Sequence, residues 1–209
     1  MVHAVEDEAR TTRDRLIETA RELFHRQGYN STGVAQILKE AGVRSGSLYY
    51  FFPSKEDLLV AVLEWYQENL WPVVMGPVFE KVTDPIERVF GVLAIYREAL
   101  RTTGFTFGCP IGNLALEMSD CRPETRRMIV ENFEGWRLAI RKCLDDAADR
   151  FPPDIDRERL SAFVLTVMEG GVMQSRSYRS IEPFDAAVAQ LRDYFERLAP
   201  GTRKSEPGS

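Results

Sequence analysis

The chain has 209 residues, of which 44% are hydrophobic and 28% are charged, a composition typical of one or two folded domains. No apolar run approaches the roughly 18 residues of a membrane-spanning helix, and the acidic N-terminus lacks the apolar segment of a secretory signal. Cys109, Cys121 and Cys143 are widely spaced and form no Cys/His cluster, so we expect no disulfide framework, no metal site and a cytoplasmic protein.

Charge is distributed unevenly along the chain. The net charge is −5, yet eight basic and only four acidic residues lie between Arg10 and Lys55. A basic block in an otherwise acidic chain is typical of a protein in which one domain meets phosphate and another does not.

Apolar residues recur at helical spacing throughout, and no segment alternates like a half-buried strand, so the expected fold class is all-α. We expect a first helix over about Thr11–Arg26 that ends at Gly28. Ser31 or Thr32 is expected to cap a short second helix. The second helix is predicted to end at Gly42, and a third to begin at Ser45 or Gly46 and end before Pro53.

The later predicted helices are longer, and several open with proline. They are about Ser54–Trp71, Pro85–Thr103, Pro110–Ser119, Pro123–Arg150, Arg157–Arg179 and Pro183–Leu198. The predicted organisation is a flexible arm (1–10), a helix-turn-helix domain (11–53), a larger helical domain (54–199) and a disordered tail (200–209).

The third helix is the one that enters the major groove in a helix-turn-helix unit. At 100° per residue, Leu48 and Phe52 share an inward face. The other residues lie elsewhere on the helix: Gly46, Ser47 and Tyr50 opposite, with Tyr49 and Phe51 on the flanks. Small residues let the backbone approach base edges, and hydroxyls bond to phosphates or bases. Taken singly, the tyrosines also fit half-buried positions, and Lys55 also fits a solvated one.

Three stretches occur in a fixed order: ETARELFHRQGYNST (18–32), ILKEAGVRSGSLYYFF (37–52) and SKEDLL (54–59). With them, residues 13 to 60 resemble the DNA-binding domain of the TetR/AcrR family of bacterial transcriptional repressors. The resemblance implies about nine helices, a homodimer that pairs through its last two helices, and a ligand-responsive C-terminal domain.

The same resemblance implies a set of DNA contacts. Thr32 would donate to phosphate, and Tyr50 and Lys55 would grip phosphates. The residues implied to lie along base edges and backbone are Ser45, Gly46, Ser47 and Tyr49. The chain departs from many family members at Ser45, where they carry Lys, and at Phe51, where they carry His. Arg44 is our candidate for part of the missing positive charge, and Phe51 either packs on a sugar or thymine methyl or folds inward.

The segment FTFGCPIGNLALEMSD (105–120) is the most unusual part of the larger domain. Pro110 fits the first turn of a helix, which places Cys109 beside an N-terminus that lowers a thiol pKa. A reactive thiol and a buried, inert one both remain open for Cys109. Asn113 and Glu117, one turn apart, are either ligand contacts or capping and surface groups.

Glu169 lies beside Gly170 and Gly171 in an apolar helix, where paired glycines mark either close helix packing or a kink. Glu169 is either a ligand contact or a solvent-facing group. The full set of candidate effector-binding residues is Tyr96, Phe107, Cys109, Asn113, Glu117, Trp136, Met168, Glu169 and Met173.

Catalytic motifs are missing from the sequence, which has two histidines and no GxSxG, HExxH, GxGxxG or Walker-type loop. We therefore expect no enzyme, no catalytic residues and no cofactor. The expected function is a homodimeric repressor that binds a palindromic DNA operator and is released by a small apolar or aromatic effector. The alternative is a DNA-binding regulator without such an effector, controlled by cysteine modification or a protein partner.

Overall fold

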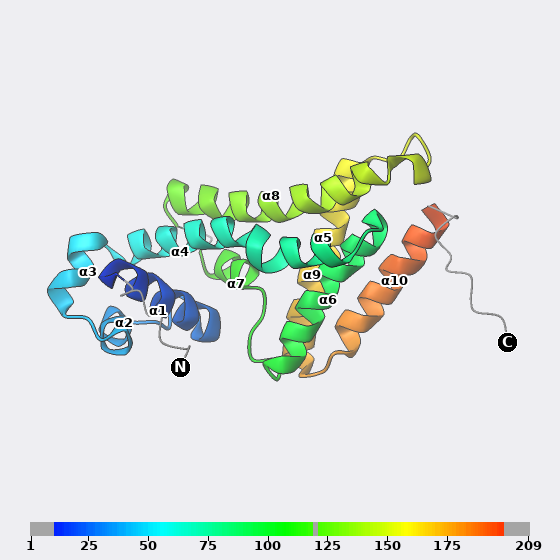
Figure 1. The fold of residues 1–209 in the computed structure, drawn as a ribbon. Helices are drawn as coiled ribbons and strands as arrows, with labels where there is room; N and C mark the ends of the chain where they lie inside the picture. The colour runs from blue at the N-terminus through cyan, green and yellow to red at the C-terminus, as the bar shows by residue number, and fades with distance from the viewer. Residues whose placement is uncertain (1–10, 119–120, 199–209) are drawn as a thin grey trace, which may run out of the picture. The chain divides into compact units, whose positions relative to one another are not determined.

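The computed structural model describes residues 11–118 and 121–198, and within these ranges every regular element is a helix (Figure 1). The predicted flexible arm and disordered tail lie outside the described residues. The α-helices are α1 (Thr12–Gln27), α2 (Val34–Ala41), α3 (Ser45–Phe51), α4 (Lys55–Asn69), α5 (Gly76–Lys81), α6 (Pro85–Thr102), α7 (Pro110–Glu117), α8 (Pro123–Asp146), α9 (Arg157–Tyr178) and α10 (Glu182–Leu198). The all-α fold class is confirmed.

The predicted end of the fourth helix at about Trp71 is wrong. The segment WPVVMGPV does not end the fourth helix, because a π-helical turn (Leu70–Met75) joins α4 to α5 without interruption. Pro72 has no N–H to donate, and the shift to i→i+5 hydrogen bonds in a π turn accommodates it inside the helix. Pro77 lies in the first turn of α5, directly after the π turn. With residues 55–81 counted as one helix, the described ranges contain nine α-helices, as the resemblance implied.

The chain divides into two compact units, which we call the head unit (1–67 and 110–132) and the body unit (68–109 and 133–209). The chain passes between them after Gln67, Cys109 and Asn132. The head unit is therefore larger than the predicted 11–53 domain, because it also includes most of α4, all of α7 and the start of α8.

The core of the head unit forms on the apolar face of α1. Its buried residues are those that the sequence predicted: Leu16, Ile17, Ala20, Leu23 and Phe24. Thr11 and Asp14 form a capping box at the start of α1, since each side chain accepts from the other residue's backbone N–H.

The prediction that Ser31 or Thr32 caps α2 is wrong. Gly33 is the N-cap and makes no side-chain capping bond. The Thr32 hydroxyl instead donates to the Gly28 carbonyl at 2.6 Å, a local bond that competes with capping.

In the body unit, α9 and α10 run side by side (Figure 1). Gly171 permits their close approach, because a Cβ there would lie 2.9 Å from Phe184 Cδ2 and 3.4 Å from Phe184 Cα. Ser175 Oγ of α9 accepts from the Phe184 backbone N–H at 3.1 Å, so the first turn of α10 is also held by a hydrogen bond. Of the two interpretations of the glycine pair, close packing at Gly171 is confirmed.

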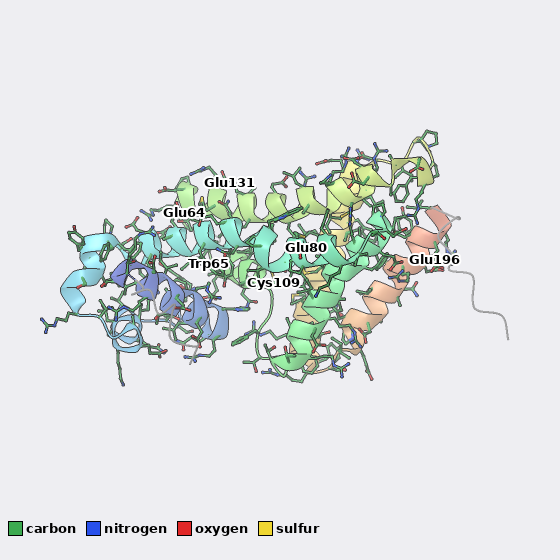
Figure 2. All side chains as sticks on the ribbon, viewed as in Figure 1. Glu64, Trp65, Glu80, Cys109, Glu131 and Glu196 are labelled. Carbon is green, nitrogen blue, oxygen red and sulfur yellow. The ribbon has the colours of Figure 1, made fainter. Side chains whose placement is uncertain are left out.

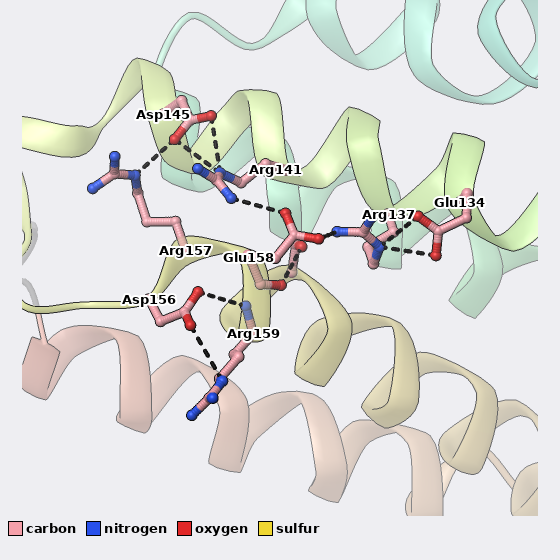
Figure 3. A network of polar contacts seen from close by, with 9 residues as sticks. Glu134, Arg137, Arg141, Asp145, Asp156, Arg157, Glu158 and Arg159 are labelled. Carbon is pink, nitrogen blue, oxygen red and sulfur yellow. Dashed lines mark hydrogen bonds and ion pairs between the residues drawn. The ribbon is translucent and has the colours of Figure 1, made fainter.

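Ion pairs tie the second half of α8 to the beginning of α9 within the body unit (Figure 3). Arg137 and Arg141 both pair with Glu158, and Asp145 pairs with both Arg141 and Arg157. Single exposed pairs contribute little, but a network that shares Glu158 and Asp145 restricts how the two helices are placed.

We predict that Gly171→Ala destabilises the protein by about 1–3 kcal/mol, because the new methyl group overpacks the contact with Phe184. Gly170→Ala is the matched control, since its Cβ would meet no atom within 4 Å and helix propensity favours alanine by up to about 1 kcal/mol. Urea unfolding of both variants measures the difference. Equal stabilities of the two variants would contradict the packing argument.

Candidate nucleic-acid interface and effector site

The faces of α3 are as predicted. Leu48 and Phe52 are buried, whereas Tyr50 is 81% exposed and Tyr49 is 59% exposed. Gly46 is also exposed, and Ser47 is half-buried beside it. Burial of one face thus leaves an outward-facing surface of small residues and phenols.

Phe51 stays at the surface rather than folding inward. It is 36% exposed, and its ring packs edge-on against Tyr50 with the centroids 4.9 Å apart. Its ring also lies 6.4 Å from that of Phe52. Phe51 therefore packs beside Tyr50 at the surface, and the alternative in which it folds inward is wrong.

The entry to α3 is set by a tight turn. Gly42 ends α2 in the left-handed conformation, with φ of 64°, which glycine adopts without strain. Arg44 is the exposed N-cap of α3 and makes no side-chain capping bond there. Ser45 is the first residue of the helix. The predicted start of the helix is confirmed.

Lys55 and Thr32 have internal partners that the sequence did not predict. Lys55 Nζ donates to the carbonyls of Tyr29 at 2.8 Å and Thr32 at 2.9 Å, which uses two of its three donors. Burial lowers the Lys55 pKa, and the charge of Glu117 acts in the opposite direction. Thr32 is only 1% exposed, and its hydroxyl is bonded to Gly28. A phosphate contact through the Thr32 hydroxyl would require that bond to break, and the phosphate contact stays a prediction.

The N-terminus of α4 is fixed to the start of α8 by two acids that were not among the predicted site residues. Glu56 Oε1 accepts from the Arg122 backbone N–H at 3.0 Å and from the Thr125 hydroxyl at 2.6 Å. The Arg122 guanidinium also pairs with Asp57 at 2.9 Å. These contacts join residues more than 60 positions apart, and no local sequence signal announces them.

These contacts shift the pKa values of both acids. Burial raises the Glu56 pKa, but the hydrogen bonds from Thr125 and Arg122 outweigh it, so the pKa lies below its usual 4.5. Hydrogen bonds from Ser54 and Arg122 lower the Asp57 pKa below 3.8.

We predict that the stabilising effect of Glu56 depends on pH. Its folded pKa is depressed, so its contribution is complete above the unfolded value of about 4.5 and is lost as pH falls through the folded value. Urea unfolding from pH 7 to pH 3 should show wild type more stable than Glu56→Gln at neutral pH, with the difference shrinking below about pH 4.5. Glu64→Gln, an exposed acid on the same helix, is the control. A difference that persists unchanged to pH 3 would contradict the argument.

The candidate effector residues are divided between the two units. Asn113 and Glu117 belong to the head unit, and the other seven belong to the body unit. The two Glu117 oxygens accept from the backbone N–H groups of Tyr29 at 3.2 Å and Asn30 at 2.8 Å. Glu117 is therefore a hydrogen-bond partner of the α1–α2 turn.

Four of the body-unit candidates form a buried polar cluster: Tyr96 of α6, Cys109, Trp136 of α8 and Glu169 of α9. The rings of Tyr96 and Trp136 lie 6.4 Å apart at 66°. Burial raises the Tyr96 pKa well above 10, and the neighbouring Cys109 and Glu169 raise it further. Burial also raises the Glu169 pKa, against a hydrogen bond from Cys109.

Two atoms of this cluster lack protein partners among the described residues: Trp136 Nε1 and Glu169 Oε1 are both buried without a hydrogen bond. The Trp136 N–H lies close enough to Tyr96 to lower its pKa slightly against the effect of burial. The geometry between the two groups does not amount to a hydrogen bond. Buried polar atoms are almost always hydrogen-bonded. A buried donor and a buried acceptor without partners therefore mark a candidate ligand-binding site.

The remaining three candidates differ in exposure. Met168 is buried in the core, Phe107 is half-buried, and Met173 is 55% exposed on α9. Met173 therefore does not line an interior site. Cys109 is buried in the segment before α7 (Figure 2), as in the plainer of its two interpretations.

Within residues 11–118 and 121–198, no group of His, Cys, Asp and Glu side chains could hold a metal ion. None of the helices in those ranges is long and apolar enough to cross a membrane.

A helix-turn-helix head with an outward-facing third helix, followed by a helical body, defines a class of DNA-binding regulators. Residues 16–62 match the family model described as bacterial regulatory proteins, tetR family. Residues 85–190 match the model described as transcriptional regulator LmrA/YxaF-like, C-terminal domain. The chain belongs to the tetR family of bacterial regulatory proteins, with a C-terminal domain of the LmrA/YxaF-like type.

Individual relatives agree with this assignment. The chain is 27% identical to the transcriptional repressor DhaR of Mycobacterium sp. strain GP1, over 93% of this chain and 96% of that protein. It is 29% identical to the regulator LmrA of Bacillus subtilis, over 89% and 97%. A crystal structure of a TetR transcriptional regulator from Chloroflexus aurantiacus aligns with a TM-score of 0.76 at 27% identity, over 90% and 95%. The protein is thus a DNA-binding transcriptional regulator, and its matched domains and relatives are regulators rather than enzymes.

Proposed function

We propose that the protein is a repressor that binds a palindromic operator as a homodimer in the cytoplasm and is released by a small apolar or aromatic effector. The observation that carries the DNA-binding part is the exposed face of α3, where Tyr49 and Tyr50 project beside Gly46 and Ser47. In this proposal Tyr50 bonds to phosphate, while Ser47 and the Gly46 backbone lie against base edges. Arg44 at the start of α3 adds positive charge. The relative DhaR is named a transcriptional repressor, which supports repression rather than activation.

Exposed aromatic residues on the last two helices support the homodimer. Phe163 of α9 and Tyr194 of α10 stack edge to face with their centroids 5.9 Å apart, and both remain nearly half-exposed. They line a hollow of about 770 Å³ in the body unit. An apolar surface of this kind is typical of an interface, and a two-fold pairing would present two α3 helices to half-sites about 34–36 Å apart or a multiple of it.

The buried polar cluster supports the effector. A small aromatic molecule would satisfy both open atoms if its carbonyl or phenol oxygen accepts from Trp136 Nε1 and if it also carries an O–H or N–H that donates to Glu169 Oε1. Effector binding would favour a conformation with lower operator affinity, and the coupling is reciprocal. The burial of Cys109 offers no direct support for the alternative of control by cysteine modification.

We predict that Tyr50→Phe weakens operator binding by about tenfold across all bound sequences, because one phosphate hydrogen bond of about 1–1.5 kcal/mol is lost. Ser47→Ala should instead change base preference at one operator position. Selection of bound sequences from a random DNA pool, followed by fluorescence anisotropy at fixed salt, measures both effects.

The matched control for the tyrosine is Tyr178→Phe, which removes an exposed hydroxyl from the body unit. It should leave affinity and sequence preference unchanged. Wild-type affinity in Tyr50→Phe, or the same preference in Ser47→Ala, would show that this face of α3 does not contact the operator.

We also predict that Trp136→Phe impairs effector response while leaving operator affinity intact, because it deletes a buried donor that has no partner among the described residues. A panel of small aromatic aldehydes, ketones and phenols, screened for release of the selected operator, should yield compounds at least about tenfold weaker on the variant. Leu138→Ala, an exposed change on the same helix, is the control. Equal release of wild type and Trp136→Phe by every active compound would rule out this site.

A further inference from the structure

The turn between α1 and α2 (28–33) is held by side chains from two other helices of the head unit. Glu117, the last residue of α7, receives the N–H groups of Tyr29 and Asn30 on its two carboxylate oxygens at 3.2 and 2.8 Å. Hydrogen bonds between a carboxylate and backbone N–H groups are about twice as strong as neutral ones. The Tyr29 and Asn30 donors are thus satisfied by α7 rather than by the helices that the turn connects.

Two carbonyls of the same turn are bonded from α4. Lys55 Nζ bonds to the Tyr29 and Thr32 carbonyls, and its ammonium lies 3.9 Å from the centroid of the Tyr29 ring. Glu117 and Lys55 therefore bind the same four-residue stretch, one at its donors and the other at its acceptors. Their opposite charges also interact, since Glu117 raises the Lys55 pKa against the lowering by burial.

Gly28 gives the Glu117 carboxylate the space it occupies. A Cβ at residue 28 would lie 2.5 Å from Glu117 Oε1, closer than real Cβ contacts allow. Gly28 also adopts φ of 90° and ψ of 160°, a conformation that is nearly exclusive to glycine. Residue 28 is therefore restricted to glycine for two reasons: the backbone conformation of the turn and the position of the Glu117 carboxylate.

The position of α7 in the chain gives this contact a role beyond packing. The chain leaves the body unit at Cys109 and enters the head unit at Pro110, the first residue of α7. At the other end of this eight-residue helix, Glu117 holds the turn that leads into α2 and α3. The helix is thus bonded to the body unit through the main chain and to the DNA-binding turn through one carboxylate.

We propose that Glu117 is a positioning residue for operator recognition, which fixes the α1–α2 turn to α7 and so sets the placement of the recognition helix α3. The inference rests on the proposed role of α3 in operator binding. In this proposal Glu117 acts within the head unit rather than in an effector site. Lys55 is the second residue that holds the turn, through its carbonyl groups.

The test compares Glu117→Ala and Glu117→Gln with wild type by anisotropy, using the operator selected from the random pool and a scrambled duplex. We expect Glu117→Ala to weaken operator binding by about tenfold or more while binding to the scrambled duplex changes little, because positioning affects base readout more than phosphate attraction. Glu117→Gln keeps one acceptor oxygen and should restore part of the loss. Hydrogen exchange at the Tyr29 and Asn30 amides should be faster in the alanine variant.

Glu124→Gln is the control, since it removes an exposed carboxylate from the same unit. A double variant with Lys55→Ala should lose less than the two single losses multiplied, because both residues act on one turn. Equal losses on operator and scrambled DNA, or unchanged amide exchange in Glu117→Ala, would overturn the proposal. A wild-type protein that selects no sequence would overturn the proposed function as well, and a Glu117→Ala protein that binds like wild type would overturn this proposal alone.

Discussion

Burial of Leu48 and Phe52 determines what α3 presents to its surroundings. The helix has only seven residues, too few to be stable alone in water, so tertiary packing has to hold it. Once these two side chains are buried, helical geometry leaves Gly46, Tyr49 and Tyr50 on the outside. The chemistry of the outer face thus depends on the apolar anchor of the inner face.

A second constraint is the need to satisfy backbone polar groups where α1 gives way to α2. The turn is short and partly buried, and its own helices do not complete its hydrogen bonds. Glu117 and Lys55 supply the missing partners, while Glu56 and Arg122 perform a similar task between α4 and α8. Charged side chains are usually regarded as surface groups that keep a protein soluble. In the head unit, these four connect one helix to another.

The local features of the fold were predictable from sequence, whereas these long-range contacts were not. Helical periodicity gave the faces of α1 and α3, and Gly28 marked the end of α1. The internal partners of Thr32 and Lys55, namely Gly28 and the turn carbonyls, were not predicted because they depend on how the chain folds back. Glu117 lies 88 residues from Tyr29, and only its place one turn after Asn113 in an otherwise apolar helix marked it as unusual. The four residues of the buried cluster were all among the candidate effector residues. That Trp136 Nε1 and Glu169 Oε1 lack partners becomes visible only once α6, α8 and α9 are packed.

The π turn at Leu70–Met75 has a consequence for comparing this chain with its relatives. A π turn holds about one residue more than an α turn, so side chains after Met75 are rotated by about 100° from the phase set by α4. A relative with an uninterrupted α-helix here would be one residue shorter and still bury the equivalent of Val78. Sequence alignments that forbid a single-residue gap between Trp71 and Gly76 would therefore pair inward-facing with outward-facing positions throughout α5.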